Sequence, residues 1–249
     1  SFYPPHHLTM GEGGSVNIVK DNKLRVIAES FRDWGRDCWC PSGVDNTCNK
    51  RFDWQLGELP RGYDHKYTYS HLGYNLKPLD PQAAIGRIQL QKLPFFIEER
   101  KKNWEKLRRG LSSTINFLEF SLPTHAVGWD KDKGFIWDST NCRTSCSWFG
   151  FKVSVRDSAP FTHTDLAREL DNQKVGNRML FGGNLIRQPA FTELLKINPA
   201  AYRCIGNLTS SDRIMNNTLF LGTYPGLTDE MLDYEIRVIK QFCLNFSIL

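Results

Sequence analysis

The sequence predicts an α/β protein built in two parts. Segments whose apolar residues recur at helical spacing alternate with segments whose apolar residues alternate as in a strand. Residues 35–65 lose this periodicity, and the pattern changes again beyond residue 111. The 249 residues, 40% of them hydrophobic, are enough for one large domain or two small ones. We therefore expect a first part over residues 1–111 and a small domain over residues 112–249.

The first part begins with short elements and a long loop. Residues 15–19 are β-prone, and residues 24–34 carry apolar side chains at helical spacing. Residues 35–65 are rich in Gly, Pro, Asp and Asn and contain three cysteines. A loop of about thirty residues inside a compact domain is usually functional or disordered, and the aromatic residues and cysteines of this one favour a function.

Two helices are expected after this loop. Asp80-Pro81 is typical of a helix start, because proline is favoured at the first helical position. Helical spacing continues over residues 81–91 and 94–111, and Leu93-Pro94 predicts a break or a kink between them.

The small domain is expected to alternate strands with helices. Residues 149–155 and 178–181 resemble strands, and residues 164–172 resemble a capped helix. Residues 229–246 predict a final amphipathic helix.

Composition and charge restrict the class of protein. We find no apolar run long enough to cross a membrane and no signal peptide, so we expect a cytoplasmic protein. The net charge is +5, and the basic residues between Arg100 and Arg109 are interleaved with acidic ones. This pattern favours a solvated helix face over a nucleic-acid surface. The seven cysteines argue against a disulfide framework and leave metal, catalytic or buried thiols.

The first motif is Ser1-Phe-Tyr-Pro-Pro-His6-His7-Leu-Thr-Met-Gly-Glu-Gly-Gly14. A serine beside backbone amides can hold a phosphate, and a histidine can accept a proton near neutral pH. The glycines at its end indicate a turn with unusual backbone angles. Two loop histidines before a glycine turn explain the same residues without a function, and the residues alone leave both interpretations open.

This motif resembles the cofactor-lysine motif of the DegT/DnrJ/EryC1 sugar aminotransferases, a family with the pyridoxal-phosphate (PLP) fold of type I. The family motif reads roughly Ser-Phe-x-x-x-Lys-x-x-x-x-Gly-Glu-Gly-Gly, so His6 stands at the lysine position and Ser1 at the position that contacts the cofactor phosphate. The resemblance implies a cofactor held without a covalent bond, namely pyridoxamine 5′-phosphate (PMP). It also implies that His6 removes a proton from the C4′ carbon of the cofactor while the sugar loses its C3 hydroxyl. The histidine is typical of the 3-dehydratase branch, whose substrates are nucleotide-linked 4-keto-6-deoxyhexoses, and here we expect the CDP-linked glucose derivative.

The resemblance covers nearly the whole chain, residues 125–146 being the least similar part. It implies the C-terminal part of the fold, namely the end of the large cofactor domain followed by the small α/β domain. The chain begins at Ser1 rather than at Met, which also indicates a fragment. We expect this fragment alone to be inactive, because other contacts to the cofactor lie outside it.

The second motif is the triplet Cys38, Cys40 and Cys48 in the long loop. Thiolates suit zinc or iron–sulfur clusters, but the spacing alone supports a metal site and incidental thiols equally. The iron–sulfur members of the 3-dehydratase branch carry the same Cys-x-Cys-x7-Cys spacing as ligands of a [2Fe–2S] cluster. The resemblance therefore implies these three ligands, a fourth cysteine outside this chain, and electrons from an NADH-dependent flavin and iron–sulfur reductase.

Four further residues receive roles. By resemblance, Asn75 reaches across a homodimer interface to the cofactor phosphate of the neighbouring subunit, although a turn before a helix also explains it. Tyr3 and Phe149 match aromatic residues near the cofactor, and ordinary packing is an equal alternative. Arg187 can clamp the phosphates of the substrate, with a surface salt bridge as the competing interpretation.

Other assignments remain open. Cys142 and Cys146 have a spacing that could bind metal, but we expect incidental thiols there. A redox-neutral dehydratase without a cluster, a zinc-stabilised binding module and a sugar-binding sensor without catalysis are the alternative functions.

Overall fold

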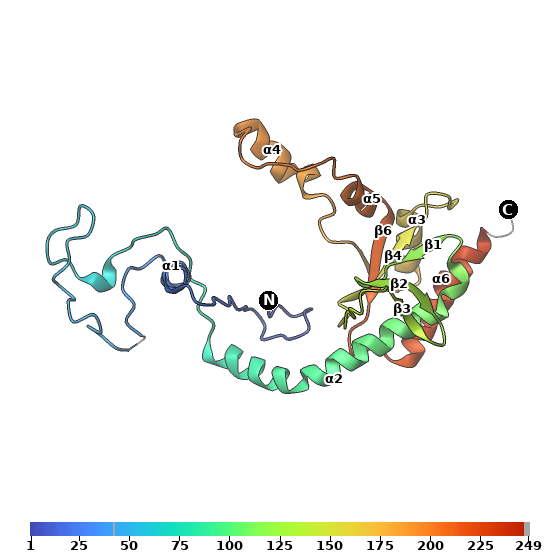
Figure 1. Ribbon diagram of the computed structural model, residues 1–249, viewed down its shortest axis with the longest axis horizontal. Coiled ribbons are helices and arrows are strands. Elements are labelled where there is room, and N and C mark those ends of the chain that lie inside the picture. The colour runs from blue at the N-terminus through green and yellow to red at the C-terminus, as the bar shows by residue number, and fades with distance from the viewer. Residues whose placement is uncertain (42, 247–249) are drawn as a thin grey trace. The chain divides into compact units, whose positions relative to one another are not determined.

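The computed structural model describes residues 1–41 and 43–246. The chain divides into two compact units, Ser1–Leu93 and Pro94–Leu249, each of which is considered by itself (Figure 1). The boundary between the units falls within the long helix α2 (Asp80–Gly110). The expected boundary at residues 111 and 112 refers to the domains of the complete fold and stays a prediction.

The first unit begins with the motif loop and helix α1 (Asn22–Arg32), which confirms the helix predicted over residues 24–34. The carboxylate of Asp21 caps this helix by accepting the backbone N–H of Leu24 at 2.9 Å. The strand suggested by residues 15–19 is wrong, because these described residues form no strand. Their valines are about four-fifths exposed, and β-branched residues favour a strand only where a partner strand and a buried face exist.

The long loop is closed where two backbone segments cross at its base. Asp33 and Asn75 form an isolated antiparallel bridge there. A Cβ atom on Gly35 would lie 1.9 Å from the carbonyl oxygen of His71, and one on Gly73 would lie 2.2 Å from the nitrogen of Gly35. Gly35 also has a φ of +82°, which favours glycine. Both glycines are therefore required for the crossing.

Between the two crossing segments the chain forms the 3-10 turn η1 (His65–Tyr67), and after the second segment it enters α2. The expectation of two helices separated at Leu93-Pro94 is wrong, because α2 continues through Pro94 to Gly110, while the alternative of a kink stays a prediction. A proline inside a helix costs about 3 kcal/mol. Tertiary packing outweighs that cost here, since Trp104 and Leu107 in the second half of α2 are buried in the core of the second unit.

The second unit is built on an antiparallel sheet. In the described part of the chain this sheet has four strands in the order β1-β4-β6-β5, and β2 pairs with β3 in a separate hairpin. The register pairs Phe151 with Leu221 and Val153 with Leu219. The strands are β1 (Leu118–Phe120), β2 (Ala126–Asp130), β3 (Gly134–Trp137), β4 (Gly150–Val155), β5 (Asn177–Met179) and β6 (Thr218–Gly222).

The helices of this unit are η2 (Ser112–Thr114), α3 (His163–Asn172), η3 (Leu185–Arg187), α4 (Pro189–Ile197), α5 (Thr209–Asn217) and α6 (Asp229–Asn245). The predicted strands over 149–155 and 178–181 are confirmed as β4 and β5. The predicted helices over 164–172 and 229–246 are confirmed as α3 and α6. The edge strand β1, the hairpin strands β2 and β3, the strand β6 and the helices α4 and α5 were not predicted.

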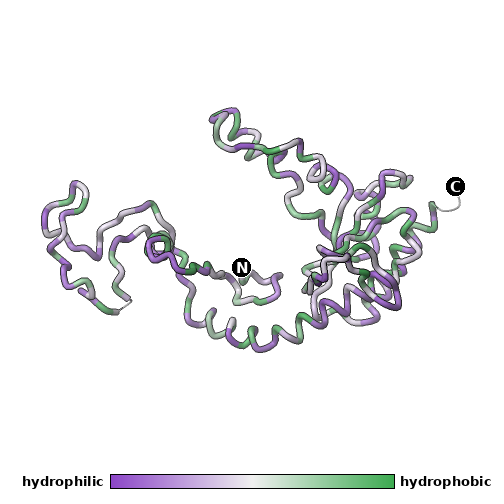
Figure 2. The backbone as a smooth tube through the Cα atoms, in the orientation of Figure 1, coloured by the Kyte–Doolittle hydropathy of each residue, from purple (hydrophilic) through white to green (hydrophobic). Residues whose placement is uncertain are grey.

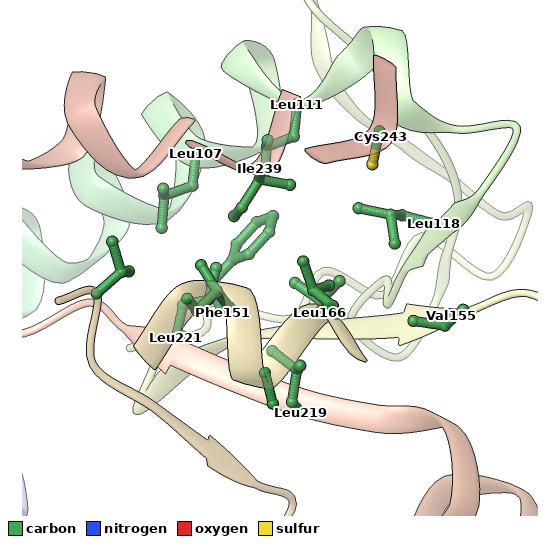
Figure 3. Packing of buried hydrophobic residues seen from close by; sticks show 14 of the residues in the cluster. Leu107, Leu111, Leu118, Phe151, Val155, Leu166, Leu219, Leu221, Ile239 and Cys243 are labelled. Atoms are coloured by element: carbon green, nitrogen blue, oxygen red, sulfur yellow. The ribbon is translucent and has the colours of Figure 1, made fainter. Parts of the chain in front are cut away.

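One apolar core holds the second unit together (Figure 3). Strand residues such as Phe151 and Leu221 meet Leu166 of α3, Ile239 of α6 and Leu107 of α2, and all five are fully buried. Burying a large apolar side chain contributes about 1.5–3 kcal/mol. The alternation of buried residues along β4 and β6 thus fixes which face of the sheet the three helices cover.

The α/β class is confirmed by this architecture. Hydrophilic and hydrophobic residues interchange along the tube, including the long helix (Figure 2). Among the described residues, no helix combines the length and apolar character that a membrane span requires.

Candidate functional site

The N-terminal motif folds into a closed loop. The backbone N–H of Phe2 donates to the carbonyl of Gly13 at 2.8 Å, and that of Met10 donates to the carbonyl of Phe2 at 3.0 Å. Met10 packs so closely on Gly13 that a Cβ there would lie 2.8 Å from its sulfur. The carbonyl of Glu12 accepts the side-chain amide of Gln82 at 3.3 Å, which ties the loop to the first turn of α2.

The loop brings together three predicted site residues, Ser1, Tyr3 and His6. The Oγ of Ser1 accepts the backbone N–H of Tyr3 at 3.3 Å. The backbone N–H of His6 donates to the carbonyl of Tyr3 at 3.0 Å, and the two rings meet edge to face at 5.9 Å. His6 is half-buried, whereas Ser1 and Tyr3 are exposed. A hydroxyl, a phenol and an imidazole therefore share one small loop surface.

Asn75 lies on another segment of the first unit. Its backbone bridges Asp33, and its side chain is exposed. Lys77 pairs with Asp33 at 2.6 Å and lies over the ring of Trp34 at 4.1 Å, which fixes the chain directly after Asn75. The predicted contact of Asn75 with a neighbouring subunit stays a prediction.

The three predicted cysteines lie around one small pocket. Cys38, Cys40 and Cys48 line it together with Asp45, Asn46, Arg51, His65 and Lys66. The hydroxyl of Thr47 donates to the Sγ of Cys40 at 3.1 Å and lowers the pKa of that thiol. Burial raises the pKa of Cys38, and the nearby Cys40 and Cys48 add to the effect. The loop thus brings three cysteines that are separate in the sequence to the lining of one pocket.

Ion pairs hold the wall of this cysteine pocket. Arg51 binds Asp64 through two hydrogen bonds of 3.0 and 2.6 Å, and Lys66 pairs with Asp45. Asp64 also caps the η1 turn by accepting the backbone N–H of Lys66 at 3.0 Å. These contacts explain why a loop without regular strands keeps a defined shape.

The donor chemistry of the cysteine pocket fits a thiophilic metal group, because thiolates suit zinc and iron–sulfur clusters. Within residues 1–41 and 43–246, however, no three His, Cys, Asp or Glu side chains are arranged as a metal site. The pocket therefore has three thiols in its lining that are not arranged as a ligand set.

Phe149 and Arg187 belong to the second unit. The ring of Phe149 packs on those of Phe181 and Phe220 at 5.7 and 5.9 Å. Arg187 is engaged with Asp212 through two hydrogen bonds of 3.0 and 2.7 Å. The salt bridge that competed with a phosphate clamp is thus present. The aromatic packing expected as the alternative for Phe149 is present as well.

Sequence reasoning missed the residues that support Arg187. The side-chain amide of Asn184 donates to Asp212 at 2.8 Å. The hydrogen bonds from Arg187 and Asn184 lower the pKa of Asp212 to about 2, and the same ion pair raises the pKa of Arg187. No periodicity signals a pair that is 25 positions apart in the chain.

The remaining four cysteines differ from those of the pocket in their exposure and in the pKa of the thiol. Cys142 and Cys204 are exposed, and burial raises the pKa of Cys146. Cys243 is part of the apolar core, where burial raises its pKa to about 12.

The fold described above is that of the PLP-dependent aminotransferases. The structure resembles the solved Escherichia coli GDP-4-keto-6-deoxy-D-mannose-3-dehydratase with bound hydrated PLP, at a TM-score of 0.66 and 22% identity. The match covers 96% of this chain and 52% of the solved one, and it confirms the predicted fold class. The model of the DegT/DnrJ/EryC1/StrS aminotransferase family matches residues 1–240, and the chain belongs to this family.

Two curated relatives are more similar in sequence. The chain is 49% identical over 247 residues to the lipopolysaccharide biosynthesis protein RfbH of Salmonella typhimurium, covering 99% of this chain and 51% of the relative. It is 46% identical to the dTDP-4-dehydro-2,6-dideoxy-D-glucose 3-dehydratase of Saccharopolyspora spinosa, covering 99% of this chain and 48% of the relative. The chain thus spans about half the length of the curated relatives it matches.

Proposed function

We propose that the protein containing this chain is a PMP-dependent 3-dehydratase of a nucleotide-linked 4-keto-6-deoxyhexose. The observation that carries the proposal is His6 at the lysine position of a closed loop that also presents Ser1 and Tyr3. Relatives named as nucleotide-sugar 3-dehydratases support it.

The residues of the loop have different roles in the proposed reaction. His6 cannot attach the cofactor covalently as a lysine does, but its imidazole can accept and return a proton near neutral pH. Ser1 supplies a hydroxyl for the cofactor phosphate, and Tyr3 orients the backbone of the loop toward His6. PMP, when bound, supplies the amine that condenses with the 4-keto group of the sugar and so activates the C3–O bond.

The finer assignments belong to the same proposal. Cys38, Cys40 and Cys48 hold a [2Fe–2S] cluster with a fourth cysteine outside this chain, and an NADH-dependent flavin and iron–sulfur reductase supplies electrons. The three thiols around one pocket, beside Arg51 and Lys66, support this role, since cations stabilise an anionic cluster. We assign the CDP-linked sugar as substrate and a homodimer in which Asn75 reaches the cofactor phosphate of the other subunit. Phe149 lies beside the cofactor, and Arg187 binds substrate phosphate after exchanging its Asp212 partner.

A second candidate is the redox-neutral dehydratase. It is favoured by one observation, namely that no three donors among the described residues are arranged as a metal site. Electron paramagnetic resonance of the anaerobically purified, dithionite-reduced full-length protein separates the two. A [2Fe–2S] signal that is lost or altered in Cys38→Ser supports the redox enzyme. Full dehydration by iron-free protein supports the redox-neutral one.

The proposed reaction is tested with full-length protein, the nucleotide-linked 4-keto-6-deoxyhexose, PMP, NADH and the flavin and iron–sulfur reductase, by following the loss of the C3 hydroxyl by mass spectrometry. His6→Asn removes the proton acceptor, so we expect turnover to fall about 10²–10⁴-fold. His7→Asn is the matched control, because it changes the adjacent histidine outside the lysine position and should retain most activity. Equal losses in both variants, or turnover without PMP, contradict the proposal.

A further inference from the structure

The motif loop that carries His6 packs on the first turns of α2 through side chains that have no role in the proposed reaction. Met10 is 7% exposed and is the one large apolar side chain that the described part of the first unit buries. A Cβ on Gly13 would lie 2.8 Å from its sulfur, and a Cβ on Gly86 of α2 would lie 3.4 Å from its own Cβ. Met10 therefore fills the space between the glycine turn of the loop and the helix.

Gln82 makes a polar contact on the same side of the helix. It lies four positions before Gly86, so the two residues share one face of α2. Its amide nitrogen, Nε2, donates to the carbonyl of Glu12 at 3.3 Å, and its Oε1 accepts the backbone N–H of Leu79 at 2.8 Å. A carbonyl needs a donor and an N–H needs an acceptor, so the two contacts together fix the orientation of the amide. One half-buried side chain thus joins the start of α2 to the motif loop.

The contact with Glu12 lies beside the backbone hydrogen bonds that close the loop. Phe2 donates to the carbonyl of Gly13 at 2.8 Å and accepts the N–H of Met10 at 3.0 Å, which holds the two ends of the loop together. His6 lies in the part of the chain between these ends. A contact that fixes the closed base of the loop on α2 therefore also fixes where the loop presents His6.

We propose that Gln82 is a positioning residue for His6, which it holds in place by fixing the base of the motif loop on α2. The inference deepens the proposed 3-dehydratase and rests on the role of His6 as proton acceptor. Misplacing a reacting group by about 1 Å can cost about 10²-fold in rate. Because the proton moves in the transition state, a loosely held imidazole should lower kcat and kcat/KM together and leave KM near the parent value.

Gln82→Glu separates the two contacts of this side chain. One carboxylate oxygen still accepts the N–H of Leu79, whereas the other replaces the donor and faces the carbonyl of Glu12, which also only accepts. We expect kcat to fall about tenfold, with KM near the parent value. Gln91→Glu is the matched control, because it makes the same change at an exposed position of the same helix and should retain the kcat of the parent.

Combination with His6→Asn tests whether Gln82 acts through His6. The turnover of all variants is measured with full-length protein in the assay described above. In His6→Asn no proton acceptor is left to position, so adding Gln82→Glu should cause no further fall in kcat. A fall of about tenfold in both backgrounds shows a general structural role and overturns the inference. A single Gln82→Glu variant with the kcat of the parent, or with only a raised KM, overturns it as well.

The same variants distinguish this inference from the function on which it rests. If His6→Asn is as active as the parent, the proposed role of His6 fails, and the inference fails with it. If His6→Asn loses activity but Gln82→Glu does not, only the inference fails. If Gln82→Glu does not fold, Gln82→Met is measured in its place, since it has the same length, no charge and no donor. Parent-like kcat in Gln82→Met then overturns the inference.

Hydrogen exchange of the full-length protein, followed by mass spectrometry, needs no turnover. Gln82→Glu should speed exchange over residues 1–14 by about two- to tenfold, the range that the loss of one net hydrogen bond allows. Exchange over residues 79–93 should stay at the parent rate, because the N–H of Leu79 keeps its acceptor. Unchanged exchange over residues 1–14 overturns the inference. Faster exchange in both segments overturns it too, because it shows that Gln82 supports the start of the helix and not the loop specifically.

Discussion

The two units of this chain are stabilised in different ways. The second unit buries a continuous apolar core of strands and helices, whereas the described part of the first unit buries one large apolar side chain, Met10. The first unit is stabilised instead by the close backbone crossing at Gly35 and Gly73, by helix caps and by ion pairs such as Arg51–Asp64. The comparison shows that the motif loop and the cysteine pocket lie in the first unit, which is stabilised by local contacts and not by an apolar core. The strongest cooperative packing lies in the unit that carries neither.

The largest expected effect is on the core of the second unit. Phe151 is fully buried, so Phe151→Ala should lower the free energy of unfolding by about 3–5 kcal/mol, as measured by urea denaturation. Phe52→Ala is the matched control in the first unit, because this ring is 56% exposed and should change stability by about 0.5 kcal/mol or less. Similar losses in both variants contradict the contrast between the units.

The next effect concerns Glu235 on α6, which is buried and whose Oε1 has no hydrogen-bond partner within residues 1–41 and 43–246. Burial raises its pKa from 4.5 to about 8, so the folded state binds this proton more tightly. The stability it contributes is present below about pH 4.5 and is lost as the pH rises through about 8. Glu235→Gln should flatten this loss, which amounts to a few kcal/mol because each pKa unit is worth about 1.4 kcal/mol.

Denaturation curves between pH 5 and about pH 9 measure this slope. Glu230→Gln on the same helix is the control, since the pKa of that exposed carboxyl is lowered and does not titrate in this range. An unchanged slope in Glu235→Gln shows that this carboxyl is not the source.

A smaller effect tests the local character of the first unit. Gly35→Ala introduces both a forbidden contact and strain at φ +82°, at a cost of about 1–3 kcal/mol. Because the crossing closes the cysteine loop, labelling of its three thiols should accelerate about tenfold or more, while unfolding of the second unit stays unchanged. Gly43→Ala has φ +76° but no neighbouring atom within 4 Å, so it isolates the strain alone. Equal labelling rates in the two alanine variants would mean that the crossing does not close the loop.

The smallest effect is at the exposed pair Arg187–Asp212. The pKa of Asp212 is lowered to about 2, so the stability from this carboxylate is present above about pH 4 and is lost as the pH falls through about 2. Asp212→Asn should remove this part of the acid dependence by lowering stability slightly at neutral pH and not below about pH 2, because an exposed ion pair contributes little. Acid unfolding followed by circular dichroism measures it, with Asp157→Asn as the control carboxylate. A large loss at neutral pH would show a greater structural role for the pair.

The sequence predicted those parts of the molecule that have local signals. Helix α3 has a capping box of Thr162 and Asp165, and α6 begins after Thr228, so both were found near their true bounds. The strand over residues 15–19 was predicted from β-propensity alone and is wrong. Pro94 indicated a break or a kink, and tertiary packing overrides the break.

Contacts between distant side chains were beyond the sequence. The motif residues Ser1, Tyr3 and His6 were identified because a continuous segment of the chain resembles the family's cofactor-lysine motif. The pairs Arg187–Asp212 and Asp37–His65 form through folding across 25 and 28 positions, and no local pattern marks them. The convergence of the three cysteines was expected, but their wall of charged side chains was not.

The central claim, that His6 replaces a cofactor-binding lysine, is tested most directly by peptide-mapping mass spectrometry of full-length protein incubated with PLP and reduced with borohydride. We predict no stable cofactor adduct on the peptide spanning residues 1–14 of the parent, and an adduct at this position in His6→Lys. An adduct on that peptide in the parent would contradict the account, because it would show that the loop binds its cofactor covalently.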